Sequence, residues 1–398
     1  MFDGTWLSPD DLSKACALDA VPGLRPHRVQ SLRLIPSLLL SCWDRPTGAF
    51  SLGHTRTVIV LATDGIGWSA AERCWSPDLL APLTSTFPST STAAWLTATT
   101  GVAPTIHGVP GPVYRARPEV LFNCVTDQAA GRITDWTAQD TAVEVDLPSH
   151  RTVFEELSDR GASVTALPGD LTTVPGRWAD AVLRGATAVA PGGDWPALSR
   201  RPVQAVRSVV EDVDAVVAGR PGAGGRLVWA FVHLDPYIHR HGYDGSIDAA
   251  LARLDQAARR WSRSGHTVVA HADHGLTRTR PTPAVDMMTA AGARALCRLP
   301  AGGAGRTRWW YPKPSHHGDV LAAVGAALGE DALVVPAGRL VDLGLVATDG
   351  VLLDRIGEVV AIALGDRFPL VDPADRYEHG SLTADEMLAP LAVWAPDH

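Results

Sequence analysis

Three runs of apolar residues stand out along the chain, and residues that can bind a metal ion follow closely after each of them. Uninterrupted apolar runs rich in β-branched residues are typical of strands buried on both faces of a parallel sheet. The carboxyl ends of parallel strands meet at one edge of the sheet, where ligands bind in open α/β folds. The pattern therefore predicts one shared polar site, built from Val58–Ala62 with Asp64, Arg226–Leu234 with Asp235, and Thr267–Ala270 with Asp273 and His274.

The segments between these runs carry helical patterns. Residues 152–217 alternate between helix and strand patterns and end in a predicted helix from Trp195 to Val217. This alternation is typical of βαβ units. A later stretch, Ser246–Arg263, predicts an amphipathic helix with one apolar face formed by Ile247, Leu251, Leu254, Ala258 and Trp261. We therefore predict an α/β fold, a three-layer sandwich with a mostly parallel central sheet.

A cluster of hydroxyl side chains, Ser89-Thr90-Ser91-Thr92, precedes a helical stretch that Gly101 closes. A hydroxyl in this position is most often an N-cap. It is also suited to attack phosphorus, because helix N–H groups can receive phosphoryl oxygens and a nearby cation can activate the hydroxyl. The cluster alone leaves both interpretations open.

The pattern changes after Gly275 and predicts a division of the chain. Residues 1–55 are expected to be an N-terminal extension packed on the core. Residues 56–275 and 376–398 should form the catalytic core, and residues 276–375 an inserted cap subdomain with a helix from Asp319 to Leu328 and a strand pair near Val351–Ala363. The aromatic trio Trp309-Trp310-Tyr311 in this cap could stack on a nucleotide base or form part of a core.

Composition narrows the classes of function. The formal charge of −8 argues against a nucleic-acid binder. The apolar stretch Leu32–Cys42 is too short for a membrane span. The first residues are acidic and lack the pattern of a signal peptide, and the five scattered cysteines suit buried thiols in a reducing compartment. We therefore expect a cytoplasmic protein with no nucleic-acid or membrane partner; the sequence does not determine its oligomeric state.

The candidate metal ligands are carboxylates and imidazoles, which suit Zn²⁺ and also Mn²⁺. They form two sets of three, as a pair of cations clamping the oxygens of a phosphoryl transfer requires. The candidates are Asp64, Asp235, His239, Asp273, His274 and His379. Other histidines are given different roles: His107 a structural hydrogen bond, His241 and His271 positions outside the ligand set, and His316-His317 a helix start or a contact with substrate.

The ordered motifs resemble the type I phosphodiesterase/nucleotide pyrophosphatase family of the alkaline phosphatase superfamily. The motifs are the strand with DGIG at Asp64, TGVAPTIHG at Thr100–Gly108, DPYIHRHG from Asp235, ADHGL from Ala272, and the late His379-Gly380 before SLTADEMLAPLAVW. The similarity extends from about Val58 to Trp394. The resemblance implies an alkaline phosphatase-like fold and a phosphoric ester hydrolase with two divalent metal ions, of which Zn²⁺ is preferred.

The resemblance also implies a role for each site residue. Asp64, Asp273 and His274 would hold one cation together with the nucleophile, and Asp235, His239 and His379 would hold the other. The nucleophile of the family lies ten residues before the Gly of the Thr-Gly pair, which is Ser91 here; Thr90 is the alternative. The sequence departs from the eukaryotic-type members at Ala94, where they place an Asn that donates to a phosphoryl oxygen, so we expect the backbone N–H of Thr92 to make this contact instead.

We accordingly predict hydrolysis of phosphodiester or pyrophosphate bonds in a nucleotide-like small molecule, through a phosphorylated Ser or Thr. The alternative keeps the same two-metal site but acts as a phosphomonoesterase, phosphonate hydrolase or phosphomutase. The sequence does not decide between these substrates.

Overall fold

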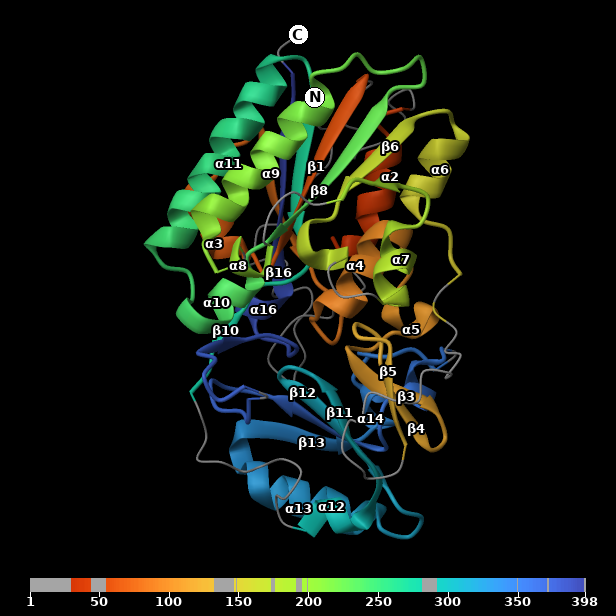
Figure 1. Ribbon diagram of the computed structural model, residues 1–398. Coiled ribbons are helices and arrows are strands. Elements are labelled where there is room, and N and C mark those ends of the chain that lie inside the picture. The colour runs from red at the N-terminus through yellow and green to blue at the C-terminus, as the bar shows by residue number, and fades with distance from the viewer. Residues whose placement is uncertain are drawn as a thin grey trace.

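A seven-stranded sheet forms the upper part of the molecule in Figure 1. This computed structural model describes residues 30–43, 55–131, 147, 149–172, 176–190, 195–198, 200–280, 292–348, 350–370 and 372–396. The strands, in spatial order, are β2 (Leu79–Thr84), β16 (Leu388–Trp394), β9 (Thr267–Ala272), β1 (Thr57–Asp64), β8 (Arg226–His233), β6 (Ser163–Leu167) and β7 (Thr187–Ala188).

The large sheet is mostly parallel. β1 runs parallel to β8 and β9, and β6 runs parallel to β8 and β7. β16 is antiparallel to both of its neighbours, β2 and β9. All eight residues of β1 are buried, as its continuous apolar run predicts. The predicted α/β class with a mostly parallel central sheet is confirmed.

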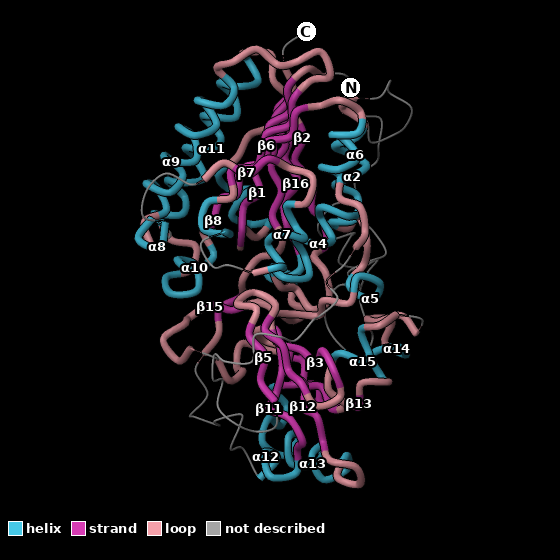
Figure 2. The backbone as a smooth tube through the Cα atoms, turned by 45° about the vertical axis from the view of Figure 1, so that its right-hand side comes forward, coloured by secondary structure: helices cyan, strands magenta, loops and turns pink. Residues whose placement is uncertain are grey.

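Helices cover both faces of this sheet (Figure 2). One core cluster joins the sheet to η1 (Leu32–Leu34), α2 (Ile35–Leu40), α4 (Ser91–Thr100), α6 (Val153–Asp159) and α7 (Arg177–Leu183). A second cluster joins the other face to α3 (Trp68–Cys74), α9 (Pro202–Val217) and α11 (Gly245–Arg263). Shorter helical segments lie at the connections: α5 (Pro104–His107), η2 (Gly169–Thr172), α8 (Trp195–Leu198), α10 (Asp235–His241) and α16 (Ala384–Met387).

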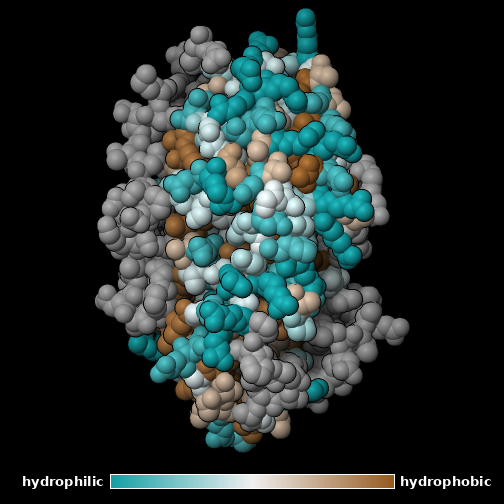
Figure 3. Space-filling model, turned by 90° about the vertical axis from the view of Figure 1, so that its left-hand side faces the viewer, coloured by the Kyte–Doolittle hydropathy of each residue, from teal (hydrophilic) through white to brown (hydrophobic). Residues whose placement is uncertain are grey.

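The long helix α11 confirms the amphipathic pattern. Its five predicted apolar residues are all buried, and Trp261, the most exposed of them, is only 2% exposed. Asp244 caps the helix by accepting hydrogen bonds from the backbone N–H groups of Ser246 and Ile247. The surface on this side of the molecule is mainly hydrophilic, with hydrophobic residues in scattered small areas (Figure 3). No helix among the described residues is long and apolar enough to cross a membrane.

A second seven-stranded sheet forms the lower part of the molecule (Figure 1). In spatial order its strands are β13 (Ala332–Pro336), β14 (Val359–Ala363), β12 (Thr307–Pro312), β11 (Cys297–Ala304), β3 (Val113–Arg117), β4 (Val120–Asn123) and β5 (Gln128–Gly131). The accompanying helical segments are α12 (Ala293–Leu296), α13 (His317–Leu328), η4 (Gly329–Asp331), α14 (Arg339–Asp342) and α15 (Leu352–Arg355).

This second sheet differs from the expected inserted cap because it uses two separate parts of the chain. β3, β4 and β5 come from residues 113–131, which the sequence grouped with the range 56–275. They join the strands of the cap through the pairing of Val113 with Gly303. Short antiparallel strands can pair with any open sheet edge, so their sequence pattern does not reveal which sheet they enter. The domain boundaries as a whole stay a prediction.

The second sheet and its accompanying helical segments form a second unit of the molecule. The aromatic trio of β12 lies inside this unit. Trp309, Trp310 and Tyr311 are 1%, 4% and 0% exposed. Alternate side chains of a strand point to opposite faces, so Trp309 and Tyr311 pack in the core shared with the large sheet, while Trp310 packs against α13. The structure favours the core interpretation of the trio over base stacking.

Two predicted elements have different boundaries in the structure. The expected helix from Trp195 to Val217 is divided into α8 and α9, because Pro202 starts α9 at its first position and the chain leaves helical geometry before it. The expected strand pair near Val351–Ala363 consists of the helix α15 and the single strand β14. β14 pairs instead with β12 and β13.

A buried ion pair joins the two units. Arg306, in the turn between β11 and β12, donates from Nε to Glu386 Oε1 of α16 at 3.0 Å, and both side chains are fully buried. Glu386 also forms a capping box with Thr383 at the start of α16. Arg306 makes further hydrogen bonds to the Thr279 hydroxyl and the Gly365 carbonyl. A buried ion pair therefore connects the second unit to the unit that contains the large sheet.

Replacing Arg306 with methionine should lower the free energy of unfolding by about 3–5 kcal/mol, because it leaves the Glu386 carboxylate buried without its counter-charge. Urea denaturation measures this loss. Arg339→Met is the matched control, since Arg339 pairs with Asp342 where both side chains are 58% exposed, and exposed pairs contribute at most about 1 kcal/mol. Equal losses in the two variants would contradict a stabilising role of the buried pair.

Candidate active site

The segments that follow three strands meet at the carboxyl edge of the large sheet. β1 lies between β8 and β9, and the register places Asp64 beside His233 and Thr63 beside Ala272. The last residues of the three strands are therefore aligned side by side, and the segments that follow them start from the same edge of the sheet. The side chains brought together there are Asp64 at the end of β1, Asp235 at the start of α10, and Asp273 with His274 after β9.

The helix α10 presents two of the predicted ligands on one face. Asp235 and His239 are four residues apart, which is about one helical turn. The Nε2 atom of His239 lies 3.0 Å from Oδ2 of Asp235. This spacing of carboxylate and imidazole depends on the helix, which starts directly after Leu234 with Pro236 in its first turn.

Gly65 allows the closest approach of two of these segments. It follows Asp64 with a φ of +77°, a conformation that side-chain-bearing residues rarely adopt. A Cβ atom at this position would lie 2.9 Å from Asp235 Oδ1 and 3.0 Å from Asp235 Cα. The Gly65 N–H donates to Asp273 Oδ1 at 3.1 Å. One glycine thus contacts the segments of both other strands.

His379 reaches the site through a short strand pairing. β15 (Tyr377–Glu378) pairs with β10 (Thr277–Arg278), so the chain carrying His379 runs beside the chain that follows His274. The imidazole rings of His379 and His274 stack with centroids 3.8 Å apart, and the His239 ring lies 5.3 Å from that of His379. All six predicted ligand side chains are therefore together, although they come from distant parts of the chain.

Backbone carbonyls orient the three imidazoles of the site. The Nδ1 atoms of His239, His274 and His379 lie 2.8, 3.2 and 2.8 Å from the carbonyl oxygens of Tyr377, Gly275 and Ser89. A carbonyl can only accept, so Nδ1 carries the hydrogen, and Nε2 keeps the lone pair whenever the ring is neutral. This is the arrangement that metal-binding histidines commonly have.

Burial and like charge act together on the carboxylates. Burial, with the neighbouring Asp273 and Asp235, raises the pKa of Asp64 well above its usual value. Burial also raises the pKa of Asp273 to about 6. For Asp235 burial acts in the same direction, but the charge of His239 and its hydrogen bond lower the pKa below the ordinary value. Three buried carboxylates in one site need positive charge to be ionised together.

The donor set fits divalent cations. Asp235 Oδ1 and Asp273 Oδ2 are buried and have no hydrogen-bond partner among the described residues, and buried polar atoms of this kind usually have one. Burial lowers the pKa of His274 to about 4, so its imidazole is neutral at pH 7. Groups with ligand atoms within 4.8 Å of one another are Asp64, Asp273 and His274; Asp235, His274 and His379; and His239, Glu378 and His379.

Ser91 lies against the first of these groups. It is the first residue of α4, and its Oγ lies 3.3 Å from Asp64 Oδ1 and 3.0 Å from His274 Nε2. Thr90 is the N-cap residue, and its side chain makes no capping hydrogen bond. The carbonyl of Thr90 accepts from Ala93 and Ala94, which leaves the N–H groups of Ser91 and Thr92 at the open end of the helix. Ser91 is thus the hydroxyl that contacts the predicted ligands.

Two charged groups near the site were missed by the sequence reasoning. Glu378 is 5% exposed, and its Oε1 lies 3.7 Å from His239 Nδ1 and from His379 Nε2. His233 ends β8 beside Asp64, with its Nε2 3.7 Å from Asp64 Oδ2 and its Nδ1 2.6 Å from Asp170 Oδ2. Glu378 directly precedes the predicted ligand His379, and His233 lies two residues before the predicted ligand Asp235. Closeness to a predicted ligand in the sequence was the one signal that could have indicated either residue.

The remaining histidines lie where the sequence placed them. His107 is buried, with Nε2 3.2 Å from the Thr97 hydroxyl and Nδ1 accepting from the Val109 N–H. His271 packs against the ring of Trp95, and His241 is exposed beside Tyr237. His316 is the N-cap residue of α13, with its Nδ1 2.9 Å from Asp319 Oδ2. His316 therefore belongs to a helix start in the second unit.

The sequence model of the type I phosphodiesterase / nucleotide pyrophosphatase family matches residues 58–370. The chain belongs to this family. The match covers the second sheet, the large sheet apart from β16 and the first residue of β1, and all the predicted ligands except His379. Family membership makes the protein a phosphoric ester hydrolase. The enzymes of this family depend on metal ions, and the residue clusters described above are this chain's candidate metal ligands. A search of curated proteins with this chain found no significant match.

Solved structures of the superfamily share the fold at low sequence identity. The mouse ectonucleotide pyrophosphatase/phosphodiesterase 5 aligns with a TM-score of 0.57 and 13% identity, over 85% of this chain and 88% of that chain. An inactive variant of that mouse protein, in complex with AMP, aligns equally well. Phosphonoacetate hydrolase from Sinorhizobium meliloti 1021, in complex with phosphonoacetate, aligns with a TM-score of 0.56 and 15% identity over 85% and 90% of the two chains.

Proposed function

We propose that this protein hydrolyses phosphodiester or pyrophosphate bonds of a nucleotide-like small molecule, with Ser91 as the nucleophile. The observation that supports this most directly is the position of the Ser91 hydroxyl, which contacts Asp64 and His274 at the N-terminus of α4. The AMP bound to the inactive variant of the mouse relative favours a nucleotide-like substrate. The net charge of −8 favours a small molecule over a nucleic acid.

The proposed centre contains two divalent cations, Zn²⁺ or alternatively Mn²⁺. Asp64, Asp273 and His274 would hold one cation together with Ser91, and Asp235, His239 and His379 would hold the other. Cations in such a site supply positive charge that lowers the pKa of a hydroxyl and stabilises the oxygens of the transferred phosphoryl group. The unpaired buried oxygens of Asp235 and Asp273 support this assignment.

The reaction would proceed in two steps. Ser91 Oγ forms a bond to phosphorus as the bond from phosphorus to the leaving oxygen breaks, and the hydroxyl proton goes to the departing oxygen by way of solvent. The product is a phosphorylated serine that still carries the other substituent of the substrate's phosphorus. The N–H groups of Ser91 and Thr92, at the open end of α4, are positioned to receive phosphoryl oxygens as negative charge develops on them. Water then attacks the same phosphorus, the Ser91 Oγ–phosphorus bond breaks, and the phosphate monoester is released as the hydroxyl is restored. The fixed Nδ1 contacts keep the three imidazoles in place through both steps.

Hydrolysis of bis-p-nitrophenyl phosphate and p-nitrophenyl phosphate tests the proposal. The metal-loaded protein should hydrolyse the diester faster than the monoester. Removing the metal with a chelator should abolish the activity, and adding Zn²⁺ or Mn²⁺ should restore it. Faster monoester hydrolysis would instead support the phosphomonoesterase alternative. Activity that survives complete metal removal would contradict the proposed centre.

Phosphonate hydrolysis is a second candidate. The phosphonoacetate hydrolase shares this fold over nine tenths of its length, and a carbon–phosphorus bond could be presented to the same Ser91 and ligand set. Including phosphonoacetate in the assay separates the two functions, because a phosphonate hydrolase should release inorganic phosphate from it and a strict diesterase should not. A phosphomutase would transfer phosphate without releasing it.

The proposal includes a cytoplasmic location. The four cysteines in the described part of the chain, Cys42, Cys74, Cys124 and Cys297, are free thiols. Thiols of this kind persist in reducing compartments, whereas secreted proteins tend to pair them. Cell fractionation with an antibody against the protein checks this part of the proposal.

A further inference from the structure

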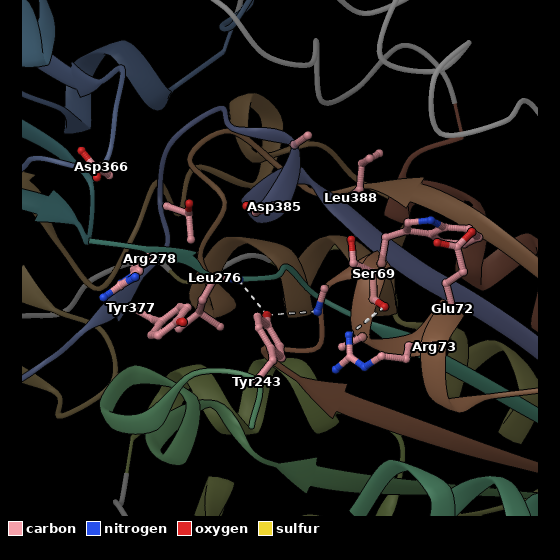
Figure 4. A pocket seen from close by; sticks show the side chains of 15 residues that line it. Ser69, Glu72, Arg73, Tyr243, Leu276, Arg278, Asp366, Tyr377, Asp385 and Leu388 are labelled. Atoms are coloured by element: carbon pink, nitrogen blue, oxygen red, sulfur yellow. Dashed lines mark hydrogen bonds between the residues drawn. The ribbon is translucent and has the colours of Figure 1, made fainter. Parts of the chain in front are cut away.

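A cavity of about 770 Å³ is lined by residues close in sequence to the predicted metal ligands but includes none of the ligands themselves (Figure 4). Its wall contains Gly67, Leu276 and the ring of Tyr243. Gly67 belongs to the turn that follows Asp64, and Leu276 belongs to the turn that follows Asp273 and His274. The cavity is therefore lined in part by residues of both turns that bear the first ligand set.

The hydroxyl of Tyr243 connects these two turns. It donates to the Gly65 carbonyl at 2.8 Å and accepts from the N–H groups of Gly67 at 3.2 Å and Leu276 at 2.9 Å. A phenol has one hydrogen and two lone pairs, so all of its hydrogen-bonding capacity is used. Burial raises the pKa of Tyr243, which keeps it the neutral phenol that this arrangement requires.

The two turns carry the carboxylates of the first ligand set, Asp64 and Asp273, and a hydrogen bond from the Gly65 N–H to Asp273 Oδ1 at 3.1 Å brings them together. The turns also contact each other tightly, since a Cβ atom on Gly275 would lie 2.7 Å from Gly67 Cα. A shift of either turn would move its carboxylate, and metal affinity depends on how firmly the surrounding groups orient the ligands.

We propose that Tyr243 is a positioning residue of the metal centre, whose hydroxyl fixes the turn of Asp64 against the turn of Asp273 and His274. The inference rests on the proposed function, because it concerns the cations that those ligands would hold. Tyr243 contacts neither substrate nor cation in this role. It acts only through the backbone of the two turns.

Tyr243→Phe removes the hydroxyl with little other change. The ring lies in the cavity wall and packs edge-on against Tyr377, with centroids 6.3 Å apart, and phenylalanine keeps that contact. Tyr237→Phe is the matched control. Tyr237 lies on the ligand-bearing helix α10, but its hydroxyl donates to the Asp244 side chain and to neither turn.

Isothermal titration of the metal-free proteins with Zn²⁺ tests the inference. Each tyrosine variant is titrated in two backgrounds: His239→Ala, which leaves the Asp64 set intact, and Asp273→Ala, which leaves the Asp235 set intact. Tyr243→Phe should weaken Zn²⁺ binding by about 10- to 100-fold in the first background. It should change binding less than about threefold in the second, and Tyr237→Phe should have little effect in either.

The other outcomes distinguish a failure of the proposed Tyr243 role from a failure of the proposed metal centre. Unchanged affinity in Tyr243→Phe, or equal loss at both sets, would overturn the role of Tyr243 and leave the proposed function standing. A wild-type protein that binds no divalent cation would overturn the metal centre and this inference with it. If Tyr243→Phe does not fold, amide hydrogen exchange of the metal-free wild type decides. The amides of Gly67 and Leu276 should then be protected, and exchange as fast as in an open loop would overturn the inference.

Discussion

Replacing Ser91 with alanine should lower kcat/KM for a diester substrate by about 10⁴-fold or more, which is the scale of loss when a nucleophilic serine is removed. The Ser91 hydroxyl is the group that contacts both Asp64 and His274, and alanine leaves no oxygen there to attack phosphorus. The change is small in volume and keeps a good helix former at the start of α4. Steady-state kinetics and metal analysis of the same preparation measure the effect.

Thr90→Ala is the control for this prediction and also tests the alternative nucleophile. Thr90 is buried one residue earlier, and its side chain makes no capping hydrogen bond to the helix. Its loss should reduce kcat/KM by less than about tenfold if Ser91 is the nucleophile, since only packing next to the site changes. Retained activity in Ser91→Ala, with the large loss in Thr90→Ala, would assign the attack to Thr90.

Gly65→Ala should lower kcat/KM by about 100-fold, because displacing a catalytic group by about 1 Å has an effect of this size. The new Cβ would lie 2.9–3.0 Å from side-chain and backbone atoms of Asp235, so rotation of the carboxylate alone cannot relieve the contact. The positive φ of Gly65 should also reduce the free energy of unfolding by about 1–2 kcal/mol.

Gly161→Ala is a control that distinguishes the effect of backbone strain at a positive φ from the effect of displacing Asp235. Gly161 has a φ of +83°, close to that of Gly65, but a Cβ atom there would have no neighbour within 4 Å. It should lose similar stability in thermal or urea unfolding while its kcat/KM stays near that of the wild type. If both variants lost activity equally, backbone strain and not contact with Asp235 would explain the result.

The sequence predicted the general position of the site because strand topology determines it. Buried runs followed by Asp64, Asp235 and Asp273 imply parallel strands, and parallel strands bring their carboxyl ends to one edge. His379 carried only a two-residue motif, yet the pairing of β15 with β10 places it against His274. Whether these side chains bind metal stays a prediction; that they lie together is an observation.

Features that depend on side-chain direction could not be predicted. The roles of Glu378 and Tyr243 follow from where an oxygen points after the strands and turns have packed, and no spacing in the sequence encodes that direction. The aromatic trio illustrates a second limit. A pocket and a core both use aromatic residues, and only the burial of both faces of β12, with Trp310 packed against α13, distinguishes them. The sheet membership of β3–β5 could not be predicted either, because the pattern of a short antiparallel strand does not specify which sheet edge it joins.

The composition of the second sheet limits how this protein could be re-engineered. Its strands come from residues 113–131 and 297–363, and the two groups meet at one pairing between Val113 and Gly303. A chimera that exchanged only residues 276–375 with a relative would force β3 to pair with a foreign strand, and a mismatch there would expose apolar side chains such as Tyr114 and Phe122. Modular exchange of the whole unit therefore requires both segments to be transplanted together, along with a partner for Glu386.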